Sequence, residues 1–307
     1  MAQIPSHVPA ASYPSPKAVV QLLKPITWFP PMWAFACGAI ASGAGIADRW
    51  FPIALGVLLA GPLLCGMSQA VNDWFDRHVD AINEPHRVIP SGRMPGQWGL
   101  AIAIAMSVLS MAVAAFLGPL IFAAALVGLA LAWGYSAPPF RFKQNGWIGN
   151  GVVGLSYETL PWITAATAAL GHAPSTRTLL IAILYGIGAH GILTLNDFKS
   201  ITGDRQMGVD TLPVLHGAQN AARIACIVMA VPQACVILLL AQAGLNTGAI
   251  LVGALLALQL LCMIRFLGDP EGKAVWYSAV GVSLYVTGMM TAAVALGSLT
   301  PLATPFG

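Results

Sequence analysis

Four oxygen-bearing side chains lie within nine residues of the segment SQAVNDWFDRHVDAINEPHRVIPSGRMP, residues 68–95: Asn72, Asp73, Asp76 and Asp80. The segment follows an apolar run, and if the helix that enters it continues, the spacings of three, four and seven residues place all four side chains on one face. Like charges at such spacings destabilise a helix by about 0.2–0.5 kcal/mol per pair. The cluster therefore needs a counter-charge, and the simplest is a divalent cation with oxygen ligands, namely Mg2+ carrying a phosphorylated substrate.

A second acidic segment, LNDFKSITGDRQMGVDTLP, also begins with Asn-Asp at the end of a long apolar run. Asp197 and Asp204 are seven residues apart, so they share one helix face unless Gly203 ends the helix. Asn72 and Asn196 are separated by 124 residues, about the length of four membrane spans. This spacing suggests a weak duplication of a four-helix unit, which would bring the two Asn-Asp corners together. Two facing carboxylate clusters could then bridge two Mg2+ ions through a diphosphate.

Basic residues that could bind this diphosphate lie near both acidic segments. Arginine clamps phosphate through two parallel hydrogen bonds, and lysine acts as a point charge. A tyrosine in the same region could donate its hydroxyl to a phosphate oxygen, or could belong to the aromatic belt at the membrane interface. The basic residues have an alternative role as cytoplasmic anchors of membrane spans. The candidate diphosphate ligands are Arg87, Arg93, Tyr135, Arg141, Lys143, Lys199 and Arg205.

The elements that position these residues are membrane spans. Hydrophobic residues make up 57% and charged residues only 8% of the 307 residues, whereas soluble domains average about 25% charged residues. The mean hydropathy is +0.77. The composition therefore indicates an all-α polytopic membrane protein. Apolar windows of about 20 residues can be placed nine times, at 27–47, 51–71, 98–117, 119–136, 149–169, 177–195, 221–241, 247–266 and 275–297.

The distribution of basic residues predicts the orientation of these spans. Arg49 and Arg177 fall on one side, and all the other lysines and arginines fall in the N-terminal tail or the opposite loops. The N-terminus and both acidic segments are therefore predicted to be cytoplasmic. This bias also explains the net charge of +3, so no nucleic-acid partner is expected. We recognise no signal or transit peptide before residue 26, and predict a cytoplasmic tail over 1–26 and a transmembrane domain over 27–300.

Two other functions have to be weighed against a diphosphate site. Acidic cytoplasmic loops are often plain solvated surface, although two clusters that both begin with Asn-Asp argue against this. A transporter would carry polar residues near the bilayer midplane, where Glu158 and His190 are the strongest candidates. Glu158 could orient a substrate, act as a base or fill a structural role, and His190 could contact a ligand or simply pack.

The cysteines and tryptophans carry weaker signals. The five cysteines all lie in apolar runs without Cys-x-x-Cys or Cys/His spacing, so neither a disulfide framework nor a zinc site is expected. Aromatic residues in the spans could line an isoprenoid cavity and stabilise an allylic cation, or could be ordinary packing residues. The tryptophans in question are Trp28, Trp33, Trp74, Trp133, Trp147 and Trp162.

Four motifs together resemble the UbiA-type intramembrane prenyltransferases, and within them the branch of chlorophyll and bacteriochlorophyll synthases. They are NDxxDxxxD at 72–80, its continuation NEPHRVIPSGR, the loop YSAPPFRFK at 135–143 and NDFKSITGDR at 196–205. NDxxDxxxD marks the superfamily, whereas DAINEP with IPSG and NDFKSxxGDR are more specific to the tetrapyrrole-esterifying branch. The resemblance covers nearly the whole chain from LLKPITWFPPMW onward, and this opening is more similar to the bacterial bacteriochlorophyll enzymes.

This resemblance implies nine transmembrane helices around a central cavity, with both acidic motifs at its cytoplasmic mouth. It implies Mg2+, as two ions bridged by the substrate diphosphate, with Asp73, Asp76 and Asp197 as catalytic residues. Some superfamily members carry more acidic residues in the second motif, and Lys199, Ser200 and Thr202 fill that gap here. The ligand count at that ion is therefore open. The implied metal ligands are Asn72, Asp73, Asp76, Asp80, Asp197 and Asp204.

The implied reaction is esterification of the propionate of bacteriochlorophyllide a by geranylgeranyl or phytyl diphosphate. The propionate is ionised at neutral pH, so it needs positioning rather than a strong base, and Glu158 need not be catalytic. The implied location is the photosynthetic, intracytoplasmic inner membrane of a bacterium, where other pigment-biosynthesis or photosynthetic proteins are expected partners. The alternatives are a chlorophyll synthase, a quinone or haem prenyltransferase, and a transporter.

Overall fold

The computed structural model describes residues 13–299, and these residues are almost entirely helical, as predicted. The sole β feature among them is an isolated bridge between Asn145 and Asp210. The α-helices are α1 Pro16–Leu23, α2 Phe29–Ala41, α3 Trp50–Leu58, α4 Gly66–Asn83, α5 Trp98–Leu117, α6 Pro119–Ser136, α7 Gly146–Gly154, α8 Leu160–Leu170, α9 Thr176–Asp197, α10 Ile201–Met207, α11 Leu212–Gln242, α12 Asn246–Leu267 and α13 Pro270–Gly297. Two π-helical segments, η3 Leu59–Cys65 and η5 Leu155–Thr159, and the 3-10 turns η1 Pro25–Trp28, η2 Ile46–Arg49 and η4 Phe142–Gln144 join them.

Each predicted window coincides with helix, but the predicted count of nine spans is not confirmed. Within residues 13–299, seven helical stretches are long and apolar enough to cross a membrane. The windows 27–47 and 149–169 are not among them. The first contains α2, which is only 13 residues long, and the second is divided among α7, η5 and α8. The seven apolar stretches nevertheless make this a multi-pass membrane protein.

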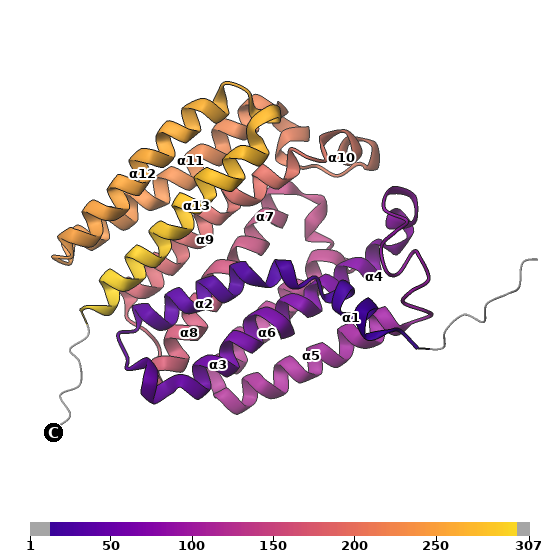
Figure 1. Ribbon diagram of the computed structural model, residues 1–307, viewed down its shortest axis with the longest axis horizontal. Coiled ribbons are helices and arrows are strands. Elements are labelled where there is room, and N and C mark those ends of the chain that lie inside the picture. The colour runs from indigo at the N-terminus through magenta and orange to yellow at the C-terminus, as the bar shows by residue number, and fades with distance from the viewer. Residues whose placement is uncertain (1–12, 300–307) are drawn as a thin grey trace, which may run out of the picture.

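The bundle has two halves that meet around α7 (Figure 1). Helices α9, α11, α12 and α13 form one half, and α3, α4, α5 and α6 lie in the other, with α2 and α8 between them. The largest buried cluster includes Trp162, Tyr185, Tyr277 and Tyr285, and it ties α8, α9 and α13 together. Helices α5 and α6 form a hairpin that turns at Gly118, whose φ of 126° is a backbone conformation that glycine adopts readily and other residues rarely do.

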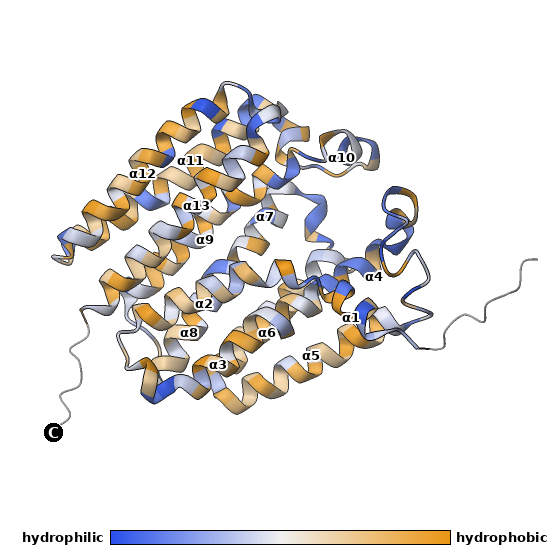
Figure 2. Cartoon of the chain, in the orientation of Figure 1, coloured by the Kyte–Doolittle hydropathy of each residue, from blue (hydrophilic) through white to orange (hydrophobic). Residues whose placement is uncertain are grey.

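Polar residues gather at the helix ends, whereas the bodies of the helices are apolar (Figure 2). The end of α4, the loop before α7 and α10 lie at one end of the molecule. Large apolar side chains such as Val108, Phe116, Ile250 and Ile264 are exposed on the outer helices, as expected for surfaces that face lipid. The fold therefore places a polar mouth on an apolar bundle.

The described part of the predicted N-terminal tail packs on the bundle. Pro16 stands at the first position of α1, and the Ser15 hydroxyl accepts a hydrogen bond from the Ala18 amide at 3.2 Å. Ala18 and Leu22 are buried in a cluster with Met67 of α4. Residues 1–12 of that tail lie outside the described residues. Since α1 is held against α4, the residue that follows it is brought to the acidic motif.

Candidate active site

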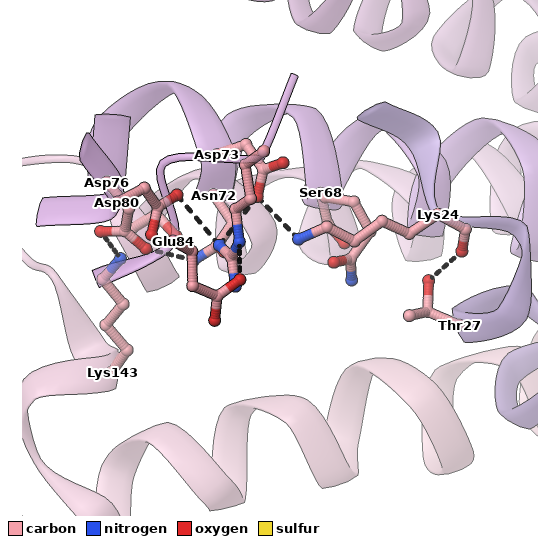
Figure 3. A network of polar contacts seen from close by, with 12 residues as sticks. Lys24, Thr27, Ser68, Asn72, Asp73, Asp76, Asp80, Glu84 and Lys143 are labelled. Carbon is pink, nitrogen blue, oxygen red and sulfur yellow. Dashed lines mark hydrogen bonds and ion pairs between the residues drawn. The ribbon is translucent and has the colours of Figure 1, made fainter. Parts of the chain in front are cut away.

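The first acidic motif lies on one continuous helix, α4, and each of its three aspartates contacts a basic side chain (Figure 3). Lys24 Nζ is 2.6 Å from an oxygen of Asp73, and Lys143 contacts Asp76. The shared helix face predicted from the spacing is confirmed. The counter-charge that the cluster requires is supplied by the protein itself in this state.

Arg87 crosses the motif from the segment that follows α4. Its guanidinium lies 2.9 Å from Asp80, 3.4 Å from Asp73 and 2.5 Å from Glu84. The side chain of Asp73 is only 3% exposed and that of Asp80 only 10%, so unpaired charges there would be costly. The Arg87 guanidinium beside Glu84 also lowers the pKa of that carboxyl. One arginine thus pairs with two buried carboxylates and one half-exposed carboxylate.

The loop after α4 holds Arg87 in place through its own turns. The Arg87 amide donates to the Glu84 carbonyl at 2.9 Å, and the Met94 amide donates to the Val88 carbonyl at 2.8 Å. Val88 and Met94 are buried against α4. This compact loop explains why the sequence NEPHRVIPSGRM accompanies the aspartates: it folds back and returns a guanidinium to them.

Two residues that reach this region have strained backbones. Lys24 and Arg141, with φ of 44° and 43°, are the non-glycine residues with positive φ within the described chain. Such conformations are uncommon for residues with a Cβ and concentrate at functional sites. The Nε of Arg141 is also buried, and no other described residue hydrogen-bonds to it. An arginine with an unsatisfied buried donor is suited to bind an anion.

Lys143 and Tyr135 connect the acidic helix to α6 and the loop before α7. Burial lowers the pKa of Lys143, and the neighbouring Asp76 carboxylate opposes this change. Tyr135 lines the central cavity, to which Asn72 and Asn196 of the two motifs also belong. Both predicted diphosphate ligands therefore lie where the two motifs meet.

The second motif does not form a single helix, so the prediction that Asp197 and Asp204 share one helix face is wrong. Helix α9 ends at Asp197, and the chain turns through 198–200 before α10 begins. Gly203 lies inside α10 and does not cause the break. The Ser200 amide donates to the Asp197 carbonyl at 3.1 Å, which closes the turn.

The second pair of aspartates is held by neutral side chains. The Asn150 amide donates to Asp197 at 3.2 Å. Asp204 accepts from the Ser200 hydroxyl at 2.6 Å and from the Thr211 hydroxyl at 3.4 Å. Within residues 13–299, neither Asp197 nor Asp204 has a lysine or arginine at ion-pair distance. These carboxylates are therefore positioned but not neutralised.

The two Asn-Asp corners open on the same cavity, as the duplication predicted. Asn72 and Asn196 both line a central cavity of about 430 Å³, together with Tyr135 and Glu158. The ends of α4 and α10 also touch, since the Asn83 amide lies 3.3 Å from the sulfur of Met207. The acidic motifs therefore form one mouth rather than two separate surfaces.

Three predicted diphosphate ligands lie apart from this acidic pairing. Arg93 donates to the Gln21 side chain and to the His86 carbonyl, both at 2.5 Å, on the outside of the loop. Lys199 and Arg205 are exposed. Their role in binding diphosphate stays a prediction.

His190 is not among the residues that line the central cavity. Its ring Nε2 is 3.2 Å from the Trp147 carbonyl, and its ring packs against the Trp147 indole with centroids 5.4 Å apart. It therefore fills a packing position between α7 and α9.

Sequence reasoning missed the roles of Lys24 and Asn150. Lys24 was counted only as a basic residue of the tail, yet it bonds Asp73 across 49 residues. Asn150 bonds Asp197 across 47 residues. The available signal for both residues is their type and place, a basic or amide side chain close to the end of a predicted span. Many residues of this chain fit that description, so it does not single out these two.

An apolar pocket adjoins the central cavity. It is lined mainly by side chains such as Phe35, Leu59 and Pro161, and shares Ser156 and Tyr157 with the cavity. A hydrocarbon chain suits this pocket, whereas the cavity mouth suits a polar group. The site can therefore hold a molecule with a charged head and an apolar tail.

The donor chemistry of the mouth fits Mg2+. Both motifs offer carboxylate and amide oxygens, the ligand type that Mg2+ prefers. No group of three or more His, Cys, Asp or Glu side chains in the described chain is placed to hold a metal ion by itself. Mg2+ commonly binds through one or two carboxylates together with water and substrate phosphates, so this sparse set is consistent with it.

Comparison with known proteins supports the same chemistry. Residues 29–286 match the model of the UbiA prenyltransferase family. The bacteriochlorophyll synthase 33 kDa chain of Cereibacter sphaeroides is 53% identical over 291 residues, covering 95% of this chain and 96% of that one. The chloroplastic chlorophyll synthase of Arabidopsis thaliana is 38% identical over 296 residues, covering 91% of this chain and 74% of that one.

Solved structures share the fold. A UbiA homolog from Archaeoglobus fulgidus bound to GPP and Mg2+ superimposes with a TM-score of 0.67 at 20% identity, covering 87% of this chain and 99% of that one. A second structure of this homolog is bound to DMAPP and Mg2+ and superimposes with a TM-score of 0.67 at 19% identity, covering 89% of this chain and 99% of that one. The family match over most of the chain and the full-length relatives agree with the two facing acidic motifs, so the chain belongs to the UbiA prenyltransferase family.

Proposed function

We propose that this protein is a bacteriochlorophyll synthase, which esterifies the propionate of bacteriochlorophyllide a with geranylgeranyl or phytyl diphosphate and releases diphosphate. The observation that carries the proposal is the opening of both Asn-Asp motifs on one cavity with Lys24, Arg87 and Lys143 beside them. The 53% identity to the Cereibacter sphaeroides enzyme supports the tetrapyrrole acceptor.

The acidic mouth would hold the diphosphate through two Mg2+ ions, one at each motif. When bound, Mg2+ neutralises charge on the departing diphosphate. The ligands would be drawn from Asn72, Asp73, Asp76, Asp80, Asp197 and Asp204.

The basic residues exchange partners when the substrate binds. Lys24, Arg87 and Lys143 pair with aspartates in the structure, and each is a donor that phosphate oxygens can attract. Movement of these donors to the diphosphate frees aspartate oxygens for metal and places positive charge where the leaving group develops negative charge. Arg141, with its unsatisfied Nε, completes the set with Tyr135.

The reaction at the acceptor needs positioning and exclusion of water. A propionate oxygen forms a bond to the allylic C1 of the prenyl chain, and the C1–O bond breaks with its electron pair leaving on the diphosphate. No proton is lost, because the propionate is already ionised. The apolar pocket near Phe35 and Leu59 would hold the prenyl chain and keep water from the electrophilic carbon.

The mouth would face the cytoplasm of a bacterium, in a photosynthetic inner membrane. This proposal is supported by the excess of lysines and arginines at the helix ends near the two motifs. The opposite end carries Arg49, which lies near Gly171. Its guanidinium is 3.9 Å from the point where a Cβ would stand if residue 171 had a side chain. The loops around these two residues therefore lie at the same, sparsely charged end.

The test is product analysis by mass spectrometry. Membranes containing the protein are incubated with Mg2+, geranylgeranyl diphosphate and, separately, bacteriochlorophyllide a, chlorophyllide a or 4-hydroxybenzoate. Geranylgeranyl bacteriochlorophyllide as the dominant product is the expected result, and Asp197→Ala should abolish it. A dominant chlorophyllide ester, a prenylated benzoate or substrate flux without any ester would overturn the proposal in favour of a chlorophyll synthase, a quinone prenyltransferase or a transporter, respectively.

A further inference from the structure

The π-helical segment η5, between α7 and α8, carries two polar groups that the protein leaves unsatisfied. The hydroxyl oxygen of Ser156 and Oε2 of Glu158 are buried and have no hydrogen-bond partner within residues 13–299. The whole Glu158 residue is only 6% exposed. Buried polar atoms are nearly always paired, and π-helical turns occur frequently at functional sites. Two unpaired atoms in one such turn point to a ligand.

Both side chains belong to the wall of the central cavity. Tyr157, between them, is fixed to α4, because its hydroxyl accepts hydrogen bonds from Gln69 at 3.1 Å and from Cys65 at 3.3 Å. This anchor sets the direction of the turn. Ser156 and Glu158 are therefore held at the cavity by a satisfied neighbour, while their own hydrogen-bonding capacity stays available.

These two groups lie away from the diphosphate end of the cavity. Asn150, which bonds Asp197, precedes Glu158 by eight residues, so the two are separated by about 12 Å along the helical axis. A ligand that satisfies Glu158 must therefore carry polar atoms well inside the site. The prenyl chain has none beyond its diphosphate. The adjoining apolar pocket accommodates it, and although Ser156 also borders that pocket, a hydrocarbon cannot satisfy its hydroxyl.

We propose that Ser156 and Glu158 form a polar subsite that binds the carbonyl-bearing edge of the tetrapyrrole acceptor, while its propionate lies at the diphosphate end. The inference rests on the proposed function, since it takes the acceptor to be a tetrapyrrole. Carbonyl oxygens on the rim of a rigid macrocycle accept hydrogen bonds, so they can pair with the Ser156 hydroxyl and with the Glu158 carboxyl in its protonated form, at a distance from the reacting carboxylate. Ser156 and Glu158 are positioning residues in this scheme, because neither touches the bond that forms.

The test compares Glu158→Leu, Glu158→Gln and Ser156→Ala with Leu155→Ala, a control in the same turn whose side chain is exposed and does not line the cavity. Loss of a hydrogen bond should raise the KM for bacteriochlorophyllide about fivefold to tenfold in Glu158→Leu and Ser156→Ala. The KM for geranylgeranyl diphosphate should stay unchanged. Glu158→Gln keeps the shape and an amide donor, so its KM should stay within about threefold of the wild-type value.

A binding measurement separates this subsite from a purely structural role. Fluorescence titration of bacteriochlorophyllide into the purified protein without prenyl diphosphate should show the same loss of affinity in Glu158→Leu. Unchanged acceptor binding in a folded Glu158→Leu protein, or a rise in the KM for the prenyl donor instead, would overturn the subsite. Failure of the proposed function looks different, because the wild-type protein itself would then form no bacteriochlorophyllide ester.

Discussion

Asp73 and Asp197 occupy the same place in the two motifs, each directly after an asparagine, yet their charge environments are opposite. Asp73 is bound by Lys24 at 2.6 Å and by Arg87 at 3.4 Å. Asp197 accepts from the neutral amide of Asn150 at 3.2 Å, without an ion pair to any described residue. The first motif is thus paired with basic side chains of the protein, whereas the second is held by neutral donors within the described residues.

The same contrast recurs seven residues further along each motif. Asp80 is bound by Arg87 at 2.9 Å, and Asp204 is bound by Thr211 at 3.4 Å, where each donor lies seven residues after its aspartate. In both motifs the donor follows its aspartate by seven residues, but the donor is the charged Arg87 in the first motif and the neutral hydroxyl of Thr211 in the second. The two motifs therefore differ in the charge of the donors that hold their aspartates.

This asymmetry predicts that a divalent cation binds first to the second motif when prenyl diphosphate is absent. Asp197→Asn should abolish most substrate-free metal binding, while Asp73→Asn should change it by less than about threefold, because Oδ1 of Asp73 already pairs with both Lys24 and Arg87. Titration of Mn2+ into the purified protein, followed by electron paramagnetic resonance of free Mn2+, measures this. Equal losses in both variants would contradict the predicted order.

Removal of the Lys24 charge should weaken binding of the prenyl donor. A charge-assisted hydrogen bond to diphosphate contributes about 1.5–3 kcal/mol, so Lys24→Met should raise the KM for geranylgeranyl diphosphate about tenfold or more. Lys24→Arg should recover part of the loss. Lys17→Met is the matched control, since Lys17 is an exposed lysine on the neighbouring helix α1, and its donor KM should equal that of the wild type. An unchanged KM in Lys24→Met would assign Lys24 to folding alone.

Arg87 and Arg93 flank the same loop but should differ sharply in importance. Arg87 pairs with two buried aspartates, and loss of one partner of such a pair costs about 3–5 kcal/mol. Arg87→Ala should therefore lower both the thermal stability and the esterification rate strongly. Among the described residues, Arg93 bonds only to Gln21, Ser91 and the His86 carbonyl at the surface, so Arg93→Ala should retain most of the activity. Thermal unfolding in detergent and initial esterification rates measure both effects. A greater loss of activity in Arg93→Ala than in Arg87→Ala would show that the loop rearranges when substrate binds.

Much of the helical frame could be predicted, because apolar length is a local property of the sequence. The predicted windows 98–117 and 119–136 coincide with α5 and α6. The meeting of Asn72 and Asn196 also followed from their spacing and is confirmed by the cavity that they share. These features depend on periodicity and on chain length between similar motifs.

The partners of the acidic residues could not be predicted in the same way. Lys24 itself follows α1 in a left-handed backbone conformation, and its side chain reaches Asp73 of α4. Nothing about a lysine in the sequence predicts that conformation. Asn150 lies in a helix interrupted by a π-helical turn, which apolar patterning does not reveal. Long-range pairing and local departures from ideal helices decide the site, and both arise from tertiary packing.

Close packing of α2 against α8 yields a prediction on stability. A Cβ added at Gly38 would lie 2.1 Å from the carbonyl oxygen of Trp162, so the two backbones would have to separate. Small residues permit such close approach between membrane helices, and overpacking typically costs about 1–3 kcal/mol. Gly38→Ala should therefore lower the thermal unfolding temperature of the purified protein in detergent.

Gly151 of α7 provides the matched control, because a Cβ there would meet no atom within 4 Å. Alanine in a helix interior is favoured over glycine by about 0.5–1 kcal/mol, so Gly151→Ala should leave the unfolding temperature unchanged or raise it slightly. Fluorescence-detected unfolding of both variants, with the wild type as reference, gives the comparison. A Gly38→Ala protein as stable as the wild type would mean that α2 and α8 can move apart without loss, and that their contact is not a rigid wall beside the apolar pocket.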